Sequence, residues 1–333
     1  MKYKMIKILC MGVMVMGLWG CGTTQHDVIT FKEDTVKENE EMGQEGTQEN
    51  RVTPHEQEEV LTRVTPTQEP LDDQPFKFVD AWGEWFETTI NPRVKKHTYH
   101  WEYLRRDGDD ISYEGSDGYT VKKGVDVSHH QGKIDWEKVK KAGYDFAFIR
   151  MAYRGYGTTG SLNLDKEYYD NIINAQKAGL EVGVYVFSQA VNEAEALEEA
   201  QLVIDNLEGI TLELPVVFDP ELIREGNART DNVTGEQFTK NTIAFCEKIK
   251  AAGYEPMIYS NMYWEAFLFD LEQLSEYPIW YADYEKVPQT PYHFKFWQYT
   301  EKGYVDGISG ETDLDAWFIG YCYNRESGEK YEV

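Results

Sequence analysis

The sequence is short of positive charge. It has 33 Lys and Arg residues against 59 Asp and Glu residues in 333 positions, which gives a formal net charge of −26. A chain this acidic repels the phosphates of nucleic acids, and it has no basic stripe with interleaved aromatic residues. We therefore expect no nucleic-acid partner.

Cysteine is also scarce, with four in the whole chain. Beyond the first 20 residues only Cys21, Cys246 and Cys322 remain, which is too few for a disulfide framework. Cys246 falls in a helical pattern of apolar residues, and this favours a buried thiol over a bond to Cys322. No spacing of Cys and His is typical of zinc, so we expect neither a metal nor another cofactor.

Long apolar runs are missing except near the N-terminus. Lys2, Lys4 and Lys7 precede an apolar run at residues 8–19, which is too short for a transmembrane helix. This layout predicts a signal peptide over residues 1–20. The stretch ending at Cys21 resembles the bacterial lipobox, whose cysteine is acylated, and the alternative is ordinary secretion. Lipidation of Cys21 would hold the protein to a membrane without spanning it.

Two segments of different composition follow. Residues 21–75 are rich in Glu, Gln, Thr and Pro with hardly any aromatic residue, so we expect a disordered acidic tether. Residues 76–121 are rich in aromatic residues and mixed charge. We expect them to form an ordered extension whose aromatic side chains pack on the main domain.

From residue 122 to 333, strand-like and helix-like segments alternate. The predicted strands lie at 124–128, 145–153, 181–188, 215–221, 256–260, 278–284, 294–299 and 312–318. The predicted helices lie at 135–143, 166–178, 192–207, 235–252 and 263–274. Alternation of this kind indicates a parallel sheet, and eight strands fit a closed barrel. Because the sequence predicts no helix after the fifth unit, we predict an irregular α/β TIM-like barrel of five β/α units and three further strands.

Acidic residues stand at the ends of several predicted strands. The apolar run from Pro215 ends in Asp219 and Glu221, whose side chains point the same way on a strand. Two close carboxyls raise one another's pKa, so one can donate a proton while the other stays charged, as in a glycosidase. Acids are so abundant here that this spacing alone is weak evidence. Further acids at strand ends, among them Asp126, Asp283 and Asp313, strengthen it because barrel chemistry gathers there.

Several motifs together resemble one family. They are Gly124–Gly132 with Ile134–Trp136, Pro215–Glu221, Ile279–Tyr284, Trp297–Tyr299, and Gly307–Gly310 leading to Asp313–Asp315. In this order, over residues 122–319, they resemble the family 25 glycoside hydrolases, the N-acetylmuramidase lysozymes. The resemblance implies an irregular barrel of β/α units. It also implies hydrolysis of the β-1,4 bond between N-acetylmuramic acid and N-acetylglucosamine in peptidoglycan.

The resemblance implies roles for four acids. Glu221 matches the general acid and base, and Asp219 matches its partner, which would orient the substrate's acetamido group as the nucleophile of a retaining reaction. Asp126 and Asp313 match two further acids of the same cleft. Between the two central acids stands Pro220, where the family more often has another residue.

Other candidates have two interpretations each. Tyr185, Tyr259, Trp280 and Trp297 lie on strands where aromatic rings would bind sugar faces, although rings in barrels are more often core. Arg150 would balance the charge of the acids or contact a muramyl carboxylate. For His129 and His130, hydrogen bonding within a loop is favoured over a metal or base role. In the extension, exposed aromatic rings could likewise stack on sugars.

The sequence thus predicts a monomeric, cofactor-free peptidoglycan hydrolase outside the cytoplasm, lipid-anchored at Cys21 or secreted. One alternative is a catalytically silent lipoprotein that binds the cell wall. Another is a barrel hydrolase acting on a different N-acetylated glycan.

Overall fold

The computed structural model describes residues 72–332 except 225 and 324–329. These residues belong to one compact unit of the chain. The predicted signal peptide, Cys21 and the tether up to residue 71 lie outside the described residues. Strand β1 (Asp72–Val79) begins four positions before residue 76, where we expected the ordered extension to start.

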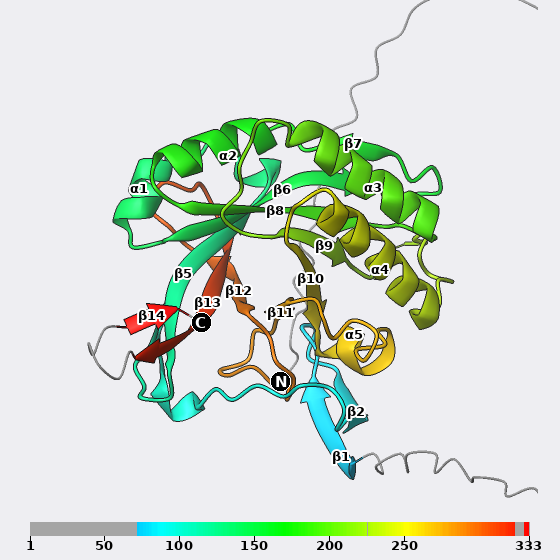
Figure 1. The fold of residues 1–333 in the computed structure, drawn as a ribbon, viewed down its shortest axis with the longest axis horizontal. Coiled ribbons are helices and arrows are strands. Elements are labelled where there is room, and N and C mark those ends of the chain that lie inside the picture. Colours follow the sequence, from blue (N-terminus) through cyan, green and yellow to red (C-terminus); the bar gives the residue numbers. More distant parts are fainter. Residues whose placement is uncertain (1–71, 225, 324–329, 333) are drawn as a thin grey trace, which may run out of the picture. The chain divides into compact units, whose positions relative to one another are not determined.

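Eight strands close into a barrel (Figure 1). In spatial order they are β5 (Tyr119–Val127), β6 (Phe146–Arg154), β8 (Glu181–Ser188), β9 (Val216–Pro220), β10 (Pro256–Asn261), β11 (Ile279–Ala282), β12 (Phe296–Gly303) and β13 (Thr312–Tyr323). Short strands β7 (Leu162–Leu164) and β14 (Lys330–Glu332) pair with β6 and β13. The eight-stranded barrel predicted from the sequence is confirmed.

The alternation of segments indicated a parallel sheet, and β13 departs from it. This strand pairs antiparallel with both β12 and β5, whereas the other neighbouring strands of the barrel are parallel. The cause is the connection at residues 304–311, which contains turns and no helix. A parallel return would need a crossover of a dozen or more residues.

Within the described residues, five α-helices accompany the barrel strands. They are α1 (Trp136–Lys141), α2 (Tyr168–Lys177), α3 (Glu193–Asn206), α4 (Gly235–Ala251) and α5 (Met262–Phe267), and 3-10 turns lie at η1 (Trp101–Tyr103) and η2 (His129–Gln131). Side chains of Asp135, Asn192 and Thr234 accept hydrogen bonds from the first backbone N–H groups of α1, α3 and α4. Helices α1 to α4 form an arc outside β5 to β9 (Figure 1).

Helix α5 is shorter than the segment 263–274 that we predicted. It ends at Phe267, and the chain continues through turns. The Phe269 N–H donates to the Trp264 carbonyl oxygen five positions back, and the Asp270 N–H donates to the Thr239 hydroxyl of α4 at 3.0 Å, so regular helical bonding does not continue there.

The extension before the barrel consists of two hairpins. Strand β1 pairs with β2 (Trp85–Ile90), and β3 (Leu104–Asp107) pairs with β4 (Asp110–Tyr113). Tyr99 between them is buried, and its ring centroid lies 4.4 Å from that of Phe318 in β13. At Tyr99 the extension packs on the barrel. Trp82 and Trp85 in the first hairpin are 56% and 73% exposed.

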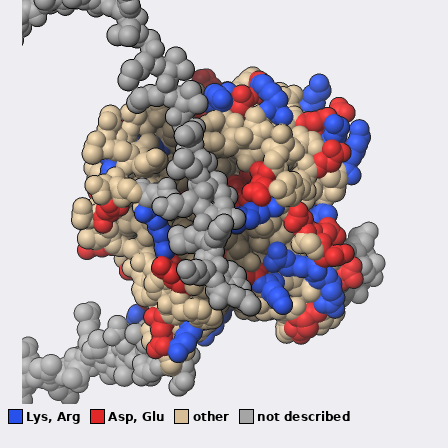
Figure 2. Space-filling model, turned by 180° about the vertical axis from the view of Figure 1, so that it is seen from behind, with Lys and Arg blue, Asp and Glu red and all other residues tan. Residues whose placement is uncertain are grey.

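The barrel interior is filled by side chains. Aromatic rings of Phe146, Phe148, Trp280, Phe296 and Trp317 pack against one another there. A filled interior leaves the strand ends as the place where a ligand can bind. On the face seen in Figure 2, acidic and basic side chains are interspersed.

Outside the barrel, α4 covers β9, the strand that carries Asp219. The Phe245 ring of α4 lies 4.8 Å from the Phe218 ring of β9, and both are buried. Cys246 beside it is a buried free thiol, as the helical pattern predicted.

Replacing Phe245 should reveal how much this contact stabilises the fold. Phe245→Ala leaves a cavity between α4 and β9 and should lower the free energy of unfolding by about 3–5 kcal/mol. Lys240→Ala, which removes an exposed pair with Glu236 on the same helix, should cost less than about 1 kcal/mol. Urea unfolding of both variants measures the difference. Equal midpoints would show that α4 does not depend on this contact.

Candidate active site

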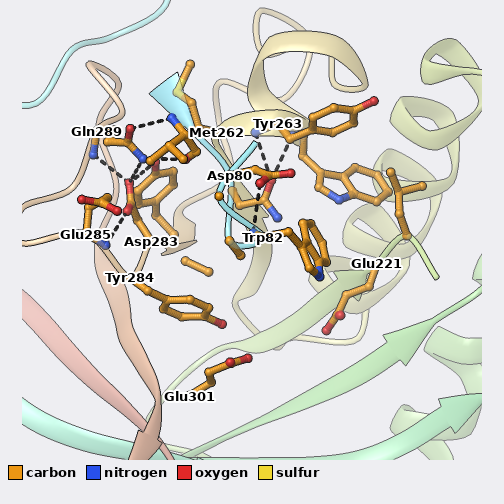
Figure 3. Close-up of a pocket in the computed structure, with 18 of the residues that line it drawn as sticks. Asp80, Trp82, Glu221, Met262, Tyr263, Asp283, Tyr284, Glu285, Gln289 and Glu301 are labelled. Carbon is orange, nitrogen blue, oxygen red and sulfur yellow. Dashed lines mark hydrogen bonds between the residues drawn. The ribbon is translucent and has the colours of Figure 1, made fainter. Parts of the chain in front are cut away.

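A cavity of about 550 Å³ opens at the carboxyl ends of β9, β10 and β11. Residues following all three strands line it, together with β12 residues and the turn between β1 and β2. Figure 3 shows Glu221, Tyr284 and Glu301 around it, with Trp82 and Asp80 from the turn. The molecule thus has a cleft where the acids were predicted to gather.

Asp219 and Glu221 meet at the end of β9. Every residue of β9 is buried, so Asp219 is buried too, whereas Glu221 is half-buried and lines the cavity. Burial raises the pKa of Asp219, and the charge of Glu221 raises it further. Burial also raises the pKa of Glu221 to about 7, with a contribution from Asp313. Glu221 can therefore carry a proton near neutral pH.

The other two predicted acids lie opposite each other on adjacent strands. Asp126 of β5 and Asp313 of β13 are register partners. Burial raises the pKa of Asp313 to about 6, and burial followed by repulsion from Asp313 raises that of Asp126. Since each of the four acids acts on the pKa of another, the structure brings all four together at one barrel end.

Gln298 of β12 connects this acid cluster to the cavity wall. Its Nε2 donates to Asp126 Oδ2 at 2.8 Å, and its Oε1 accepts from the hydroxyls of Tyr259 and Tyr284, both at 2.9 Å. Tyr259 was a predicted binding residue, and it lines the cavity. Gln298 and Tyr284 were not predicted as site residues. Both lie in the motifs that carried the resemblance, so that match was the available signal.

Two predicted binding residues belong to the core. Trp280 and Trp297 are 1% and 0% exposed, and their indole N–H groups donate to Asp315 and to the Asp283 carbonyl oxygen. Neither ring reaches a surface that a sugar could contact. Tyr185 is also buried, in edge-to-face contact with Trp280.

Arg150 lies beside the acid cluster and is itself paired. Its Nε and Nη2 donate to Asp165 Oδ2, both at 3.0 Å, and His129 Nδ1 lies 2.8 Å from the same oxygen. Its positive charge opposes the upward pKa shifts of Asp219 and Glu221. His129 thus takes part in hydrogen bonds to Asp165 between two loops at this end of the barrel.

Asp283, also at a strand end, organises a loop. Its Oδ2 accepts from the Tyr281 hydroxyl at 2.9 Å and from the Gln289 backbone N–H at 2.8 Å, and its Oδ1 accepts from the Glu285 backbone N–H. With so many donors, this carboxylate shapes one wall of the cavity.

The backbone of Glu221 is held from the neighbouring strand. Buried Gln189, which follows β8, donates from Nε2 to the Glu221 carbonyl oxygen at 2.6 Å. Its Oε1 accepts from the Thr230 hydroxyl at 3.0 Å, and Arg229 donates to its carbonyl oxygen at 3.1 Å. Nothing in the sequence pattern had indicated Gln189.

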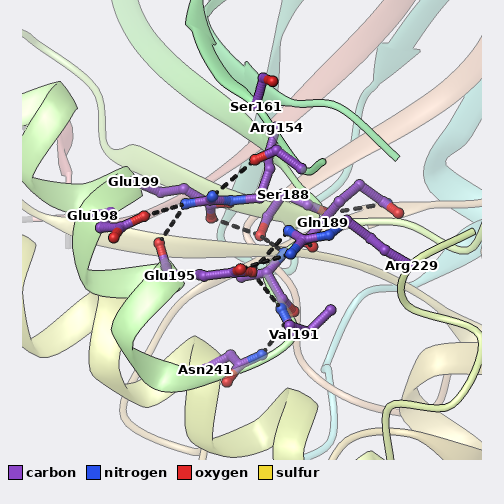
Figure 4. Close-up of polar contacts among 12 residues, drawn as sticks. Arg154, Ser161, Ser188, Gln189, Val191, Glu195, Glu198, Glu199, Arg229 and Asn241 are labelled. Atoms are coloured by element: carbon purple, nitrogen blue, oxygen red, sulfur yellow. Dashed lines mark hydrogen bonds and ion pairs between the residues drawn. The ribbon is translucent and has the colours of Figure 1, made fainter. Parts of the chain in front are cut away.

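Gln189 lies in the larger polar network of Figure 4. There Arg154 pairs with Glu199 at 2.6 Å, the Ser188 hydroxyl donates to Glu199 at 2.6 Å, and Arg229 pairs with Glu195. These contacts tie α3 and the ends of β6 and β8 to the loop after β9. They fix the main chain from which the Glu221 side chain reaches the cavity.

Across residues 72–332, apart from the gaps at 225 and 324–329, no group of three or more His, Cys, Asp or Glu side chains is arranged to hold a metal ion. The polar groups described at this site are carboxyl groups, the Gln298 amide and the hydroxyls of Tyr259 and Tyr284.

The chain is similar to proteins named as lysozymes. The autolytic lysozyme of Clostridium acetobutylicum is 27% identical over 201 residues, covering 60% of this chain and 56% of that protein. Lysozyme M1 of Streptomyces globisporus is 30% identical over 201 residues, covering 57% and 66%. The chain therefore spans between about half and two thirds of the length of these relatives.

A solved structure shares the fold. The modular autolysin LytC of Streptococcus pneumoniae, solved with a synthetic peptidoglycan ligand, superposes with a TM-score of 0.53 at 23% identity. The match covers 74% of this chain and 57% of that one.

A family model, Glycosyl hydrolases family 25, matches residues 125–308. This segment includes the end of β5 with Asp126, all of β9 with Asp219, and Glu221. Since the match spans more than half of the chain, the protein belongs to glycosyl hydrolase family 25.

Proposed function

We propose that this protein is a peptidoglycan hydrolase that cleaves the β-1,4 bond between N-acetylmuramic acid and N-acetylglucosamine, with Glu221 as general acid and base. The observation that carries the proposal is a cavity-lining Glu221 whose pKa is raised to about 7 beside three further acids. Family membership and relatives named as lysozymes support the substrate class.

In the first step, protonated Glu221 gives its proton to the glycosidic oxygen as the bond to the anomeric carbon breaks. The oxygen of the substrate's own acetamido group bonds to that carbon, and Asp219 orients the acetamido group. In the second step, Glu221 takes a proton from water as the water oxygen attacks the same carbon, and the bond between that carbon and the acetamido oxygen breaks, which restores the acetamido group. Two displacements at one carbon retain its configuration.

The acid cluster suits this cycle. Glu221 must be protonated at the start and ionised afterwards, and a pKa of about 7 allows both states near neutral pH. Burial supplies most of the upward shift, and Arg150 limits it.

Glu221→Gln keeps the shape of the side chain and removes the acid. It should lower the rate of release of new reducing ends from peptidoglycan by about a hundredfold to ten-thousandfold, because a positioned proton donor contributes that much. Glu285→Gln makes the same change at an exposed position in the cavity lining and should keep most of the activity. Equal rates for wild type and Glu221→Gln would reject the acid assignment. A wild type that binds peptidoglycan without releasing reducing ends would indicate a silent binding protein.

The raised pKa of Glu221 also sets the pH dependence. Below about pH 7 the carboxyl is protonated and can act as the acid, and above it the proton is lost. The value of kcat/KM on soluble glycan fragments should therefore fall as pH rises through about 7. A profile that rises across neutral pH would contradict the assignment.

We also propose that the protein acts outside the cytoplasm, held to a membrane by acylation of Cys21. The support is the basic start, the short apolar run and the lipobox-like stretch before Cys21. Within the part of the chain that the structure describes, no helix is long and apolar enough to cross a membrane.

Cys21→Ser removes the acylation site and should move the protein from the membrane fraction to the medium. Cys10→Ser, in the apolar run, leaves the lipobox intact and should stay membrane-bound. Immunoblots of fractionated producing cells distinguish the two. If Cys21→Ser remains with the membrane, the anchor lies elsewhere.

A further inference from the structure

The turn of the first hairpin forms part of the cavity wall. Asp80, Trp82 and Gly83, between β1 and β2, line the same cavity as Glu221 (Figure 3). The family match begins at residue 125, so this turn lies outside the matched segment. The extension therefore contributes to the site in addition to packing on the barrel.

One end of the turn is fixed through the side-chain amide of Gln289. Gln289 Oε1 accepts from the Val79 backbone N–H at 2.9 Å, and Nε2 donates to the Val79 carbonyl oxygen at 2.8 Å. The backbone N–H of Gln289 in turn donates to Asp283. The hairpin is thus hydrogen-bonded to the loop that follows β11.

The other side of the turn is fixed by Arg224, three residues after Glu221. Its guanidinium pairs with Asp80 at 2.6 Å and with Glu84 at 3.2 Å. Asp80 Oδ1 also accepts from the backbone N–H groups of Trp82 and Glu84, both at 2.9 Å. Two sets of contacts, from two loops of the barrel, therefore hold the turn in one conformation.

The turn held in this way carries the apolar ring of Trp82 at the cavity. The Arg224 guanidinium carbon lies 3.8 Å from the centroid of its ring, and the side chain is still 56% exposed. Trp82 lines the cavity, whereas the more exposed Trp85 does not, so the ring surface that Trp82 exposes is available to a ligand bound there. A cation stacked on one face limits the orientations that the ring can adopt.

We propose that Trp82 is a sugar-binding platform that adds a subsite to the substrate groove beside Glu221. This inference depends on the proposed action on glycans. One face of a pyranose ring presents C–H groups, which pack on an indole while the sugar hydroxyls stay hydrated. A fixed indole at the cavity edge would thus hold a sugar unit next to the one that reacts.

The test compares three variants of the hairpin. Trp82→Ala removes the platform, Trp82→Phe keeps a smaller ring, and Trp85→Ala is the control, because Trp85 is exposed on the same hairpin outside the cavity lining. On glycan oligosaccharides long enough to reach the turn, Trp82→Ala should raise KM roughly tenfold, the loss expected for one aromatic contact. Shorter oligosaccharides should show little change, Trp82→Phe should recover part of the affinity, and Trp85→Ala should match the wild type.

Equal KM values for Trp82→Ala and Trp85→Ala at every oligosaccharide length would overturn the subsite. If the wild type does not hydrolyse glycans at all, the proposed function fails first. Calorimetric titration of the same oligosaccharides into the same proteins then decides on the subsite, since binding needs no turnover. Weaker binding by Trp82→Ala alone supports the platform, and equal binding by all variants rejects it.

Discussion

The site depends on the way in which the barrel closes. Strand β13 runs antiparallel between β12 and β5, and this direction puts its first residues at the end where the parallel strands finish. Asp313 therefore lies opposite Asp126, and both share a barrel end with Asp219 and Glu221. A parallel β13 would carry Asp313 to the other end of the barrel. Burial is the main cause of the raised pKa values, and the repulsion from Asp313 that adds to it at Asp126 and Glu221 depends on strand direction as much as on residue type.

Around this cluster, the chain supplies rigid supports from distant parts of the sequence. Gln298 connects Asp126 to two tyrosines, and Gln189 holds the main chain of Glu221. The Asp283 carboxylate accepts hydrogen bonds from the loop that follows β11 and so stabilises the conformation of that loop. Neutral amide side chains suit these tasks because they bridge groups without adding charge to an acidic site.

Much of the fold could be predicted from the sequence, because strand and helix patterns in the barrel are regular. All eight barrel strands fall where apolar, β-branched runs indicated them, and Asn192 caps α3 as its position suggested. The direction of β13 could not be read from the pattern, since a strand has the same alternation in either direction. The length of α5 was missed because a contact distant in sequence helps to end it, the hydrogen bond from the Asp270 N–H to the Thr239 hydroxyl of α4.

The sequence located the acids of the site more successfully than the aromatic residues that line it, and the reason is physical. Residue type identifies an acid at a strand end, and the four acids do converge. Residue type does not tell whether an aromatic ring on a strand is buried in the core or lines the cavity. Trp280 and Trp297 therefore could not be distinguished from cavity-lining rings. The hairpin turn was harder still, because its place beside Glu221 depends on contacts between residues such as Asp80 and Arg224, 144 positions apart.

The buried thiol of Cys246 has a consequence for the proposed action outside the cytoplasm. Burial raises the pKa of this thiol, and the thiolate is the species that reacts with oxidants and disulfides. Once α4 has docked on β9, the side chain is therefore inert in an oxidising environment. Packing thus keeps Cys246 out of mispaired cross-links without the need for a reducing compartment.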